Sequence, residues 1–373
     1  MRRLTVVQLL PALDAGGVER STLEIAEALV SNGHRAIVVS NGGRMLPQLQ
    51  AIGAEHVALA IGRKSPWTFR HVPALRRLFA EIDADIVHAR SRLPAWLAWR
   101  ALQGMRGPRP RFVTTAHGLN SPSRYSAIMA RGERVICVSN VAREYLLQHY
   151  PRTDPQRLRV IPRGIDPARF PRVESGQEPD RALRARLSMQ HSQLGGNGPL
   201  LLMPGRGTRL KGHADALDLL GALRADGMDA RLWMPGALDP ARAAYIDELQ
   251  ARAQAAGIAD ALAITAPTDA IAEAYAASDL VLQLSRKPEA FGRTVIEALA
   301  VGRPVLGWAY GGVGELLAQL QPEGAVVAFD MDALRQRARA LLAHPPTPAA
   351  TMPYTLQAMQ RATMDVYREL SER

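Results

Sequence analysis

Short apolar runs alternate with amphipathic segments along almost the whole chain, and this pattern predicts an α/β architecture. Six runs in the first half have the length and composition of buried strands: residues 4–10, 36–40, 56–61, 85–89, 111–116 and 134–138. Four segments between them have the helical period: residues 19–32, 66–82, 94–103 and 141–149. Strands that alternate with helices favour a parallel sheet covered on both faces.

The same alternation begins again in the second half and predicts a second domain of the same kind. Its strand-like runs are residues 199–203, 231–234, 261–265, 280–284, 304–308 and 325–329. We expect a Rossmann-like N-terminal domain at residues 1–165 and a second one at 166–350, two doubly wound domains that face each other across a cleft. A polar linker is expected at about 166–198, with a possible helix at 181–190. A last helix within 351–373 is expected to pack back across the domain junction.

Composition is consistent with a folded, two-domain chain. The 373 residues suit two domains of roughly 150–200 residues, and 47% hydrophobic residues exclude a disordered chain. The apolar run near the N-terminus is too short for a membrane span and lacks a cleavage site, so we interpret it as the first strand. The single cysteine, Cys137, lies in an apolar run, which predicts a buried reduced thiol and a cytoplasmic location.

The net charge of +11 is concentrated in the first half. Residues 1–165 hold 24 Lys and Arg against 11 Asp and Glu, whereas the remainder is slightly acidic. Such asymmetry indicates an anionic partner: a membrane surface, a phosphorylated acceptor or nucleic acid. Nucleic acid is not expected, because no nucleic-acid-binding motif is present.

Two basic stretches of this half also contain large aromatic residues, which is typical of contact with anionic headgroups. Trp67 and Phe69 lie among arginines in the first stretch, and Trp96 and Trp99 in the second. The sequence therefore predicts peripheral association with an anionic membrane. The alternative for Trp96 and Trp99, which are three residues apart on a helix, is packing in the core.

Candidate chemistry follows the strands, since open α/β sheets bind ligands at the carboxyl ends of their strands. Gly16 and Gly17 follow the first strand and precede a helix, an arrangement that admits an anion. The dinucleotide-binding spacing is absent, and the second strand leads into Asn41 and not into an acidic residue. Arg206 and Lys211 follow the strand at 199–203 and could hold a diphosphate, although each could equally be a solvated surface cation.

The segment EAFGRTVIEALAVGRPVLG has the most specific pattern. Glu289 precedes a helix whose first turn is expected at 291–294, and Glu297 lies two helical turns further on. Free backbone N–H groups of Gly292, Arg293, Thr294 and Val295 would face a phosphate. Carboxylates accept hydrogen bonds from vicinal hydroxyls, so a sugar and a ribose are plausible ligands. The alternatives are a favourable charge at a helix start for Glu289 and a solvated helix face for Glu297.

This segment resembles the EX7E motif of the retaining GT-B glycosyltransferases of family 4. AGGVERSTLEIAEALVSNGH, TTAHG, VICVSNVAREYL, VIPRGIDPARF, PGRGTRLKGH and GGVGELL resemble further landmarks of that family, in the same order. The resemblance implies that Arg206 and Lys211 bind the donor diphosphate, Glu289 the sugar and Glu297 the ribose. It further implies backbone contacts at Phe291–Val295, an approach of Gly16 and Gly17 to the diphosphate, and His117 near the reacting centre.

The same resemblance implies a metal-independent hexosyltransferase that needs no cofactor. The donor would be a nucleoside-diphosphate sugar, and the acceptor a cell-envelope glycolipid such as lipopolysaccharide core. Asp83 and Asp85 could be mistaken for a metal-binding pair, but they precede a strand and so lie at the wrong end of the sheet. Two departures stand out: Arg163 replaces the usual Asn of an IPNGID-like segment, and Ala309 and Tyr310 precede the last glycines. The alternatives are a sugar-nucleotide 2-epimerase and a non-catalytic basic membrane-binding protein.

Overall fold

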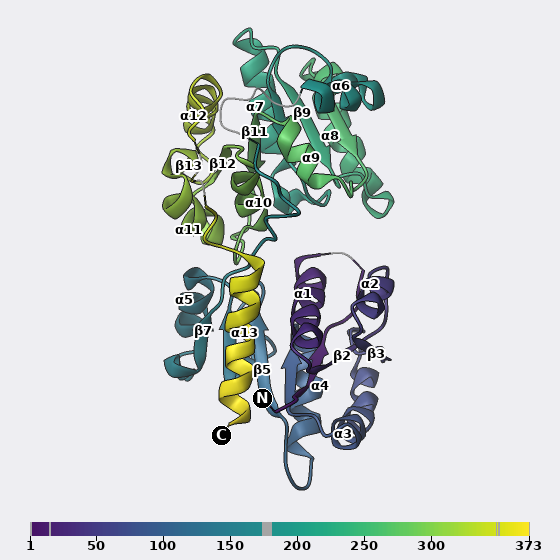
Figure 1. Ribbon diagram of the computed structural model, residues 1–373. Coiled ribbons are helices and arrows are strands. Elements are labelled where there is room, and N and C mark those ends of the chain that lie inside the picture. The colour runs from purple at the N-terminus through teal and green to yellow at the C-terminus, as the bar shows by residue number, and fades with distance from the viewer. Residues whose placement is uncertain (1, 15, 174–180, 348, 350, 373) are drawn as a thin grey trace. The chain divides into compact units, whose positions relative to one another are not determined.

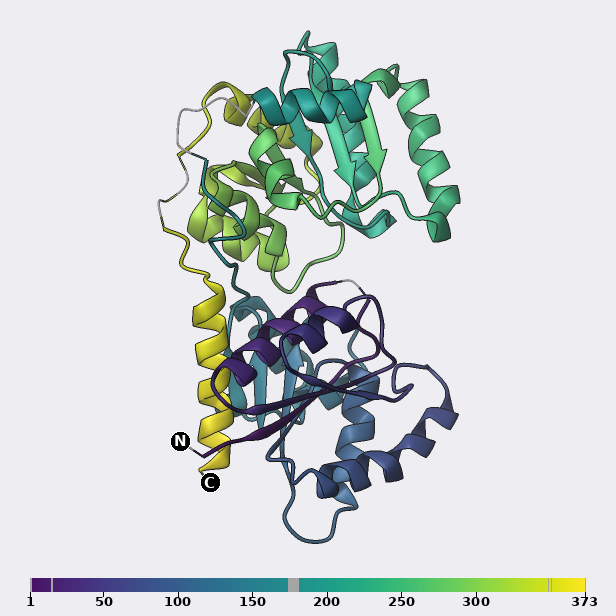
Figure 2. The same cartoon turned by 45° about the vertical axis from the view of Figure 1, so that its right-hand side comes forward.

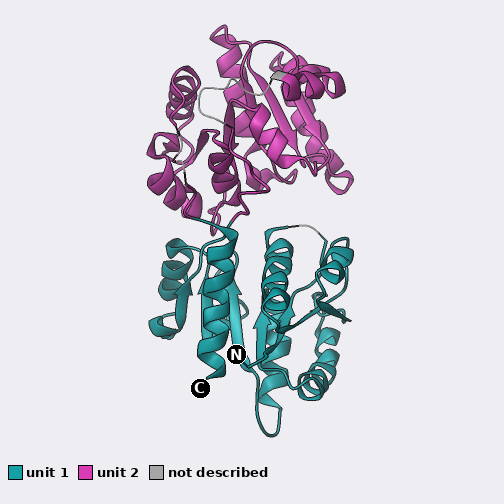
Figure 3. Cartoon of the chain, in the orientation of Figure 1, with its two compact units in different colours: residues 1–164, 354–373 teal, residues 165–353 magenta. Residues whose placement is uncertain are grey.

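Two separate parallel sheets organise the chain, each in its own unit (Figures 1 and 3). The computed structural model describes all residues except 1, 15, 174–180, 348, 350 and 373. Unit 1 comprises Met1–Gly164 and Tyr354–Arg373, and unit 2 comprises Ile165–Pro353. The part of the expected linker at residues 174–180 lies outside the described residues.

Unit 1 contains a seven-stranded parallel sheet in the order β3-β2-β1-β4-β5-β6-β7. Its strands are β1 (Thr5–Leu9), β2 (Arg35–Ser40), β3 (Glu55–Ala58), β4 (Ile86–Ala89), β5 (Arg111–Ala116), β6 (Arg134–Cys137) and β7 (Leu158–Val160). Its helices are α1 (Gly17–Ser31), α2 (Leu46–Ala51), α3 (Val72–Glu81), α4 (Arg92–Gln103), α5 (Asn140–His149) and α13 (Leu356–Ser371), with the 3-10 turns η1 (Pro66–His71), η2 (Ser126–Ala130) and η3 (Pro155–Arg157).

Both faces of this sheet are covered, so its strands are apolar on both sides. Along β1, Val6 belongs to the core under α1 and α13, whereas Val7 and Leu9 belong to the core under α3 and α4. Helix α13 packs beside α1 and places Tyr367 and Leu370 in the first of these cores (Figure 1). The last helix of the chain is therefore part of the core of unit 1.

Unit 2 contains a six-stranded parallel sheet in the order β10-β9-β8-β11-β12-β13, with helices on both faces (Figure 2). Its strands are β8 (Leu200–Leu202), β9 (Arg231–Pro235), β10 (Leu262–Thr265), β11 (Leu280–Gln283), β12 (Val305–Trp308) and β13 (Ala325–Val326). Its helices are α6 (Arg181–Gln190), α7 (His213–Ala225), α8 (Ala243–Ala255), α9 (Ile271–Ala277), α10 (Arg293–Val301), α11 (Gly311–Leu320) and α12 (Met331–Ala343), with the 3-10 turns η4 (Ser192–Leu194), η5 (Arg209–Lys211), η6 (Pro240–Arg242), η7 (Ala259–Ala261) and η8 (Pro322–Gly324).

The structure differs from the sequence expectation at several elements. The single helix expected at 66–82 is divided into η1 and α3, because Pro73 in the first turn of α3 has no N–H with which to continue the hydrogen bonds of η1. The strand expected at 325–329 ends at Val326, and Phe329 has a φ of 71°. The expectation also missed α2 and β7, the latter an edge strand that contains Arg159.

Candidate functional site

In unit 2 the order of strands reverses between β8 and β11, which pair with each other although they lie far apart in the sequence. Ligands of doubly wound sheets bind at this kind of switch point, outside the carboxyl ends of the strands. The chain leaves β8 into the segment that holds Arg206 and Lys211, and it leaves β11 into the segment that holds Glu289. The topology thus brings two of the expected segments to one edge of the sheet.

Lys211 and Glu289 form an ion pair at this edge. Nζ of Lys211 lies 2.6 Å from Oε1 of Glu289, and the two side chains are 29% and 26% exposed. The hydroxyl of Ser285 donates to the same carboxylate oxygen at 2.5 Å. Burial by itself would raise the pKa of Glu289, but the Lys211 charge and the hydrogen bonds from Lys211, Ser285 and Gln283 outweigh it and hold the pKa below its usual value. Glu289 is therefore a carboxylate at neutral pH.

Backbone contacts fix the position of the Glu289 segment. The carbonyl of Glu289 accepts from the N–H of Gly312 at 2.7 Å, and Glu289 and Gly311 form an isolated parallel bridge. Gly311 has a φ of 61°, and a Cβ at that position would lie 2.7 Å from the Glu289 carbonyl oxygen. A side chain at Gly311 would displace Glu289, so this glycine is required by close approach.

Helix α10 begins two residues later than the sequence suggested. Its first residue is Arg293, and its N-cap is Gly292 with a φ of 120°, so Phe291 and Gly292 precede the helix. The N–H of Val295 is not free as expected, because it donates to the carbonyl of Gly292 at 3.0 Å in a tight first turn. Helix α10 still begins only a short segment after Glu289, and its N-cap offers no side chain to satisfy the first N–H groups.

Glu297 is buried and is held on both carboxylate oxygens. Oε1 accepts from Nε of Arg293 at 2.9 Å, and Oε2 accepts from the hydroxyl of Tyr275 at 3.0 Å. It is therefore not a solvated residue of the helix face. Because each carboxylate oxygen can accept more than one hydrogen bond, Glu297 keeps the capacity to accept from a ligand hydroxyl.

Arg206 takes no part in the ion pair. It is exposed, and its guanidinium makes no hydrogen bond or ion pair with any residue that the structure describes. The structure therefore joins Lys211 to Glu289 and leaves the side chain of Arg206 in solvent.

In unit 1 the strand order reverses between β1 and β4, and candidate residues follow β1 and β5. Gly16, the N-cap of α1, has a φ of 151°, which favours glycine, and Gly17 has open space where a Cβ would be. His117 follows β5 and is half-buried. Nη2 of Arg163 donates to Nδ1 of His117, and Nη1 of Arg163 donates to the hydroxyl of Ser21 at 2.5 Å.

Four polar residues near the two candidate sites were not predicted from the sequence, although their position in apolar strands could have indicated them. Each lies within or just after an otherwise apolar strand: Gln8, His88, Gln283 and Ser285. Gln8 is fully buried and accepts from Nε of Arg90 at 3.0 Å, whereas Ser285 supports Glu289. A polar side chain in a buried strand must find a partner, so it marks a polar network behind a site.

The two basic aromatic stretches differ in exposure. Trp67 and Phe69 on η1 are 78% and 42% exposed. Trp96 and Trp99 on α4 are half-buried, pack against the core under α3 and α4, and contact each other edge to face at 5.6 Å. Arg131 lies over both indole rings. Trp96 and Trp99 therefore pack in part against the core, as the alternative proposed, and contact of these two rings with a membrane stays a prediction.

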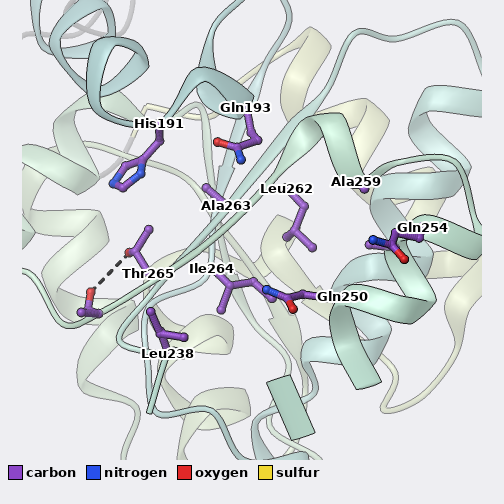
Figure 4. A pocket seen from close by; sticks show the side chains of 12 residues that line it. His191, Gln193, Leu238, Gln250, Gln254, Ala259, Leu262, Ala263, Ile264 and Thr265 are labelled. Carbon is purple, nitrogen blue, oxygen red and sulfur yellow. Dashed lines mark hydrogen bonds between the residues drawn. The ribbon is translucent and has the colours of Figure 1, made fainter. Parts of the chain in front are cut away.

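Unit 2 also has cavities at a distance from the ion pair. One of about 510 Å³ runs along the edge strand β10 and is lined by residues that include His191, Gln193, Gln250 and Thr265 (Figure 4). Another, of about 490 Å³, is lined in part by Thr265–Pro267 at the end of β10. Neither is lined by Glu289 or Lys211.

The described part of the chain contains neither a candidate membrane-spanning helix nor a candidate metal site. None of the helices described there is both long and apolar enough to cross a membrane. No three His, Cys, Asp or Glu side chains are grouped there as metal ligands would be.

Comparison with known families and structures gives matches along the whole chain. Residues 15–169 match the family model "Glycosyltransferase Family 4", and residues 186–356 match "Glycosyl transferases group 1". A glycosyltransferase structure from Rickettsia africae superposes with a TM-score of 0.85 at 26% identity, over 99% of both chains. The Anabaena protein HepE in complex with UDP and glucose superposes with a TM-score of 0.80 over 98% of this chain and 100% of that one, but at 17% identity this likeness shows the fold alone.

Curated sequences match over a shorter span. The D-inositol 3-phosphate glycosyltransferase of Xylanimonas cellulosilytica is 32% identical over 189 residues, which are 50% of this chain and 43% of that protein. The matched stretches cover about half the length of such relatives.

Proposed function

Because the chain belongs to glycosyltransferase family 4 and has its GT-B fold, we propose that it transfers a hexosyl group from a nucleoside-diphosphate sugar to an acceptor hydroxyl, with retention of configuration. The observation that carries this proposal is the Lys211–Glu289 ion pair at the switch point of unit 2, just before the N-terminus of α10. A cation and a helix N-terminus suit a diphosphate, and an ionised carboxylate beside them suits sugar hydroxyls.

In this proposal the bond between the anomeric carbon and the diphosphate oxygen breaks, and the acceptor oxygen bonds to that carbon on the same face. The acceptor proton passes to the departing diphosphate, so no protein base is needed on the opposite face. Negative charge develops on the diphosphate, where Lys211, Arg206 and the first N–H groups of α10 would stabilise it. Glu289 would hold the sugar hydroxyls and Glu297 the ribose, which leaves catalysis to positioning and electrostatics. Gly16, Gly17 and His117 remain predicted donor contacts of unit 1.

We further propose that the acceptor is an anionic glycolipid of the cell envelope, such as lipopolysaccharide core, and that the enzyme works in the cytoplasm at a membrane surface. The basic balance of residues 1–165 supports an anionic acceptor or surface. The exposed Trp67 and Phe69 on η1, near Arg63 and Lys64, support a shallow interfacial contact.

Incubation with labelled nucleotide sugars tests the central proposal. UDP-glucose is the first donor to try, followed by other UDP-, GDP- and ADP-hexoses, with an envelope glycolipid extract as acceptor. We expect label in the lipid fraction with the α-anomeric configuration of the donor kept. Conversion of the donor to its 2-epimer without transfer would favour the isomerase alternative. A protein that binds the donor and turns nothing over would be a non-catalytic relative.

Vesicle sedimentation tests the membrane contact. We expect binding to vesicles with anionic lipid, little binding to neutral vesicles, and release by high salt, because exposed cations contribute through screened charge. Trp67→Ala should weaken the binding, whereas Met189→Ala, which removes an equally exposed apolar residue from unit 2, should not. Equal binding to neutral and anionic vesicles, or none at low salt, would mean that the basic half serves a phosphorylated acceptor instead.

A further inference from the structure

We infer that Arg163 holds His117 as a neutral ring with its proton on Nε2, so that His117 serves a bound ligand as a hydrogen-bond donor and not as a proton acceptor. The identity of that ligand rests on the proposed function, but the state of the ring does not. Arg163 stands where the resembling sequences have a shorter, neutral Asn, so the device belongs to this chain.

The direction of one hydrogen bond determines the position of the proton. A guanidinium has only donors, so the ring nitrogen that faces it must accept. Nη2 of Arg163 makes its short contact with Nδ1 of His117 and lies 3.5 Å from Nε2. A neutral imidazole that accepts at Nδ1 carries its hydrogen at Nε2. Apart from Arg163, no residue in the described part of unit 1 bonds to Nε2 of His117, so this donor is available to a ligand.

Arg163 is itself held in place. It is 8% exposed, its Nη1 donates to the hydroxyl of Ser21 at 2.5 Å, and the same nitrogen lies 3.8 Å from the sulfur of Met359 on α13. Arg90 donates to the same hydroxyl at 3.2 Å. The guanidinium that faces His117 is therefore fixed between α1 and α13, which makes it suitable to orient a second side chain.

The charges around His117 oppose a second proton on the ring. Burial lowers the pKa of His117 far below its usual value, and Arg163, Arg90 and His88 lower it further. The pKa of His88 is itself well below normal, chiefly because of burial, so this neighbour is also neutral. His117 consequently stays uncharged through the range in which the protein would work.

The consequence concerns the role of His117 at the carboxyl edge of the unit 1 sheet. A catalytic base would have to take the proton from the hydroxyl of the acceptor. The ring nitrogen without a hydrogen, Nδ1, already accepts a hydrogen bond from Arg163 and cannot take that proton. The Nε2–H group can donate to an oxygen of the sugar, and it does so without changing its charge during the reaction. Arg163 is thus a positioning residue, and His117 is the group that contacts the ligand.

Side-chain mimicry provides the activity test. The amide nitrogen of Gln lies near the position of Nε2, so His117→Gln should lose less transfer activity than His117→Ala and leave the shape of the kcat/KM pH profile unchanged. His117→Ala should raise KM for the donor and lower the rate. If His117 were a base, His117→Gln would lose transfer by about 10²- to 10⁴-fold and would abolish an acid limb of the profile. That result would overturn the inference.

Nitrogen NMR of ¹⁵N-histidine-labelled protein provides the test that needs no activity. His117, assigned by the signal missing in His117→Gln, should show hydrogen on Nε2 and none on Nδ1 from pH 8 to pH 5.5. Titration near pH 6.5, or hydrogen on Nδ1, would overturn the inference. In Arg163→Leu the ring should gain its second proton at a higher pH than in the wild type, and Arg163→Lys should restore the wild-type behaviour.

The controls distinguish three outcomes: a misfolded variant, a protein without transfer activity, and a His117 ring in another protonation state than the one inferred. Arg157→Leu removes an exposed arginine that pairs with Asp154 and should change neither the spectrum nor the profile. Thermal melting shows whether Arg163→Leu is folded; if it is not, the wild-type spectrum and Arg163→Lys still decide. Absence of transfer from every nucleotide sugar would refute the proposed function, whereas the NMR result would still decide the state of His117.

Discussion

The ion pair between Lys211 and Glu289 leads to an unusual prediction for Glu289→Gln. The free enzyme holds Lys211 against Glu289 at 2.6 Å, yet the proposed function needs Lys211 at the donor diphosphate. Replacing the carboxylate by an amide of the same size removes the charged competitor for Lys211 and exchanges the charged acceptor for sugar hydroxyls for a weaker, neutral one. Transfer should therefore fall while the free nucleoside diphosphate binds more tightly.

The magnitudes follow from the exposure of the pair. An ion pair with side chains 29% and 26% exposed is only partly screened by solvent. Pairs of this kind contribute about 0.2–1 kcal/mol, so its release should tighten diphosphate binding up to about fivefold. Loss of a hydrogen bond to a charged acceptor costs about 1.5–3 kcal/mol, so kcat/KM should fall by roughly 10- to 150-fold.

Calorimetry with UDP, GDP and ADP measures the first effect, and initial rates of transfer measure the second. Glu248→Gln is the matched control, since Glu248 pairs with Arg209 on the exposed surface of unit 2 and should alter neither quantity.

The pH dependence of stability provides a second test of the ion pair. Because the folded-state pKa of Glu289 is lowered, its contribution is present above the unfolded pKa and is lost as pH falls through the folded pKa. The melting temperature of the wild type should exceed that of Glu289→Gln at pH 7, and the difference should shrink below about pH 4.5. Weaker binding of the free diphosphate by Glu289→Gln would refute the competition between carboxylate and ligand.

Three further predictions test the site, the core and the thiol. Lys211→Ala and Arg206→Ala should each weaken binding of the free nucleoside diphosphate by about 1.5–3 kcal/mol in calorimetry, and transfer should persist in EDTA; loss that Mg²⁺ or Mn²⁺ restores would contradict the metal-independent proposal. Tyr367→Phe should cost about 1–3 kcal/mol in denaturant unfolding, because it removes the hydrogen bond that the Tyr367 hydroxyl makes with His88 at 2.6 Å in the core; an unchanged midpoint would argue against that bond. Cys137 should resist iodoacetamide at pH 8 until the protein is unfolded, since burial raises the pKa of its thiol to about 12, and rapid alkylation of the native protein would disagree.

The sequence predicted most strands well because both sheets are covered on both faces. Strands buried on two sides are continuous apolar runs, and β5 was expected with the bounds that it has. Two edge strands lack such a continuous apolar run: β7 carries Arg159, and β13 has only two residues. The apolar period alone could not separate η1 from α3, because a proline near a helix start permits both a boundary and a continuation.

The sequence indicated which segments contribute to the site, but not which of their side chains contact each other. Strand ends and a helix start indicated Glu289 and Lys211 separately, because each lies after a buried strand. Their pairing depends on the adjacency of β8 and β11, and no local pattern encodes the contact between residues 78 positions apart. The helix period likewise could not say on which side Trp96 and Trp99 pack, since either face of α4 could carry two rings three residues apart.

The position of α13 in the core of unit 1 has a consequence for biosynthesis. Ribosomes deliver the strands of that sheet first, then all of unit 2, and only then the helix that covers the face holding Val6 and Ile86. During elongation the part of this apolar face that α13 covers is exposed beside α1, and His88 lacks its Tyr367 partner. We therefore expect a chaperone to bind the nascent first half of the chain. Chains released before α13 is made would expose hydrophobic surface and would be prone to aggregation and proteolysis.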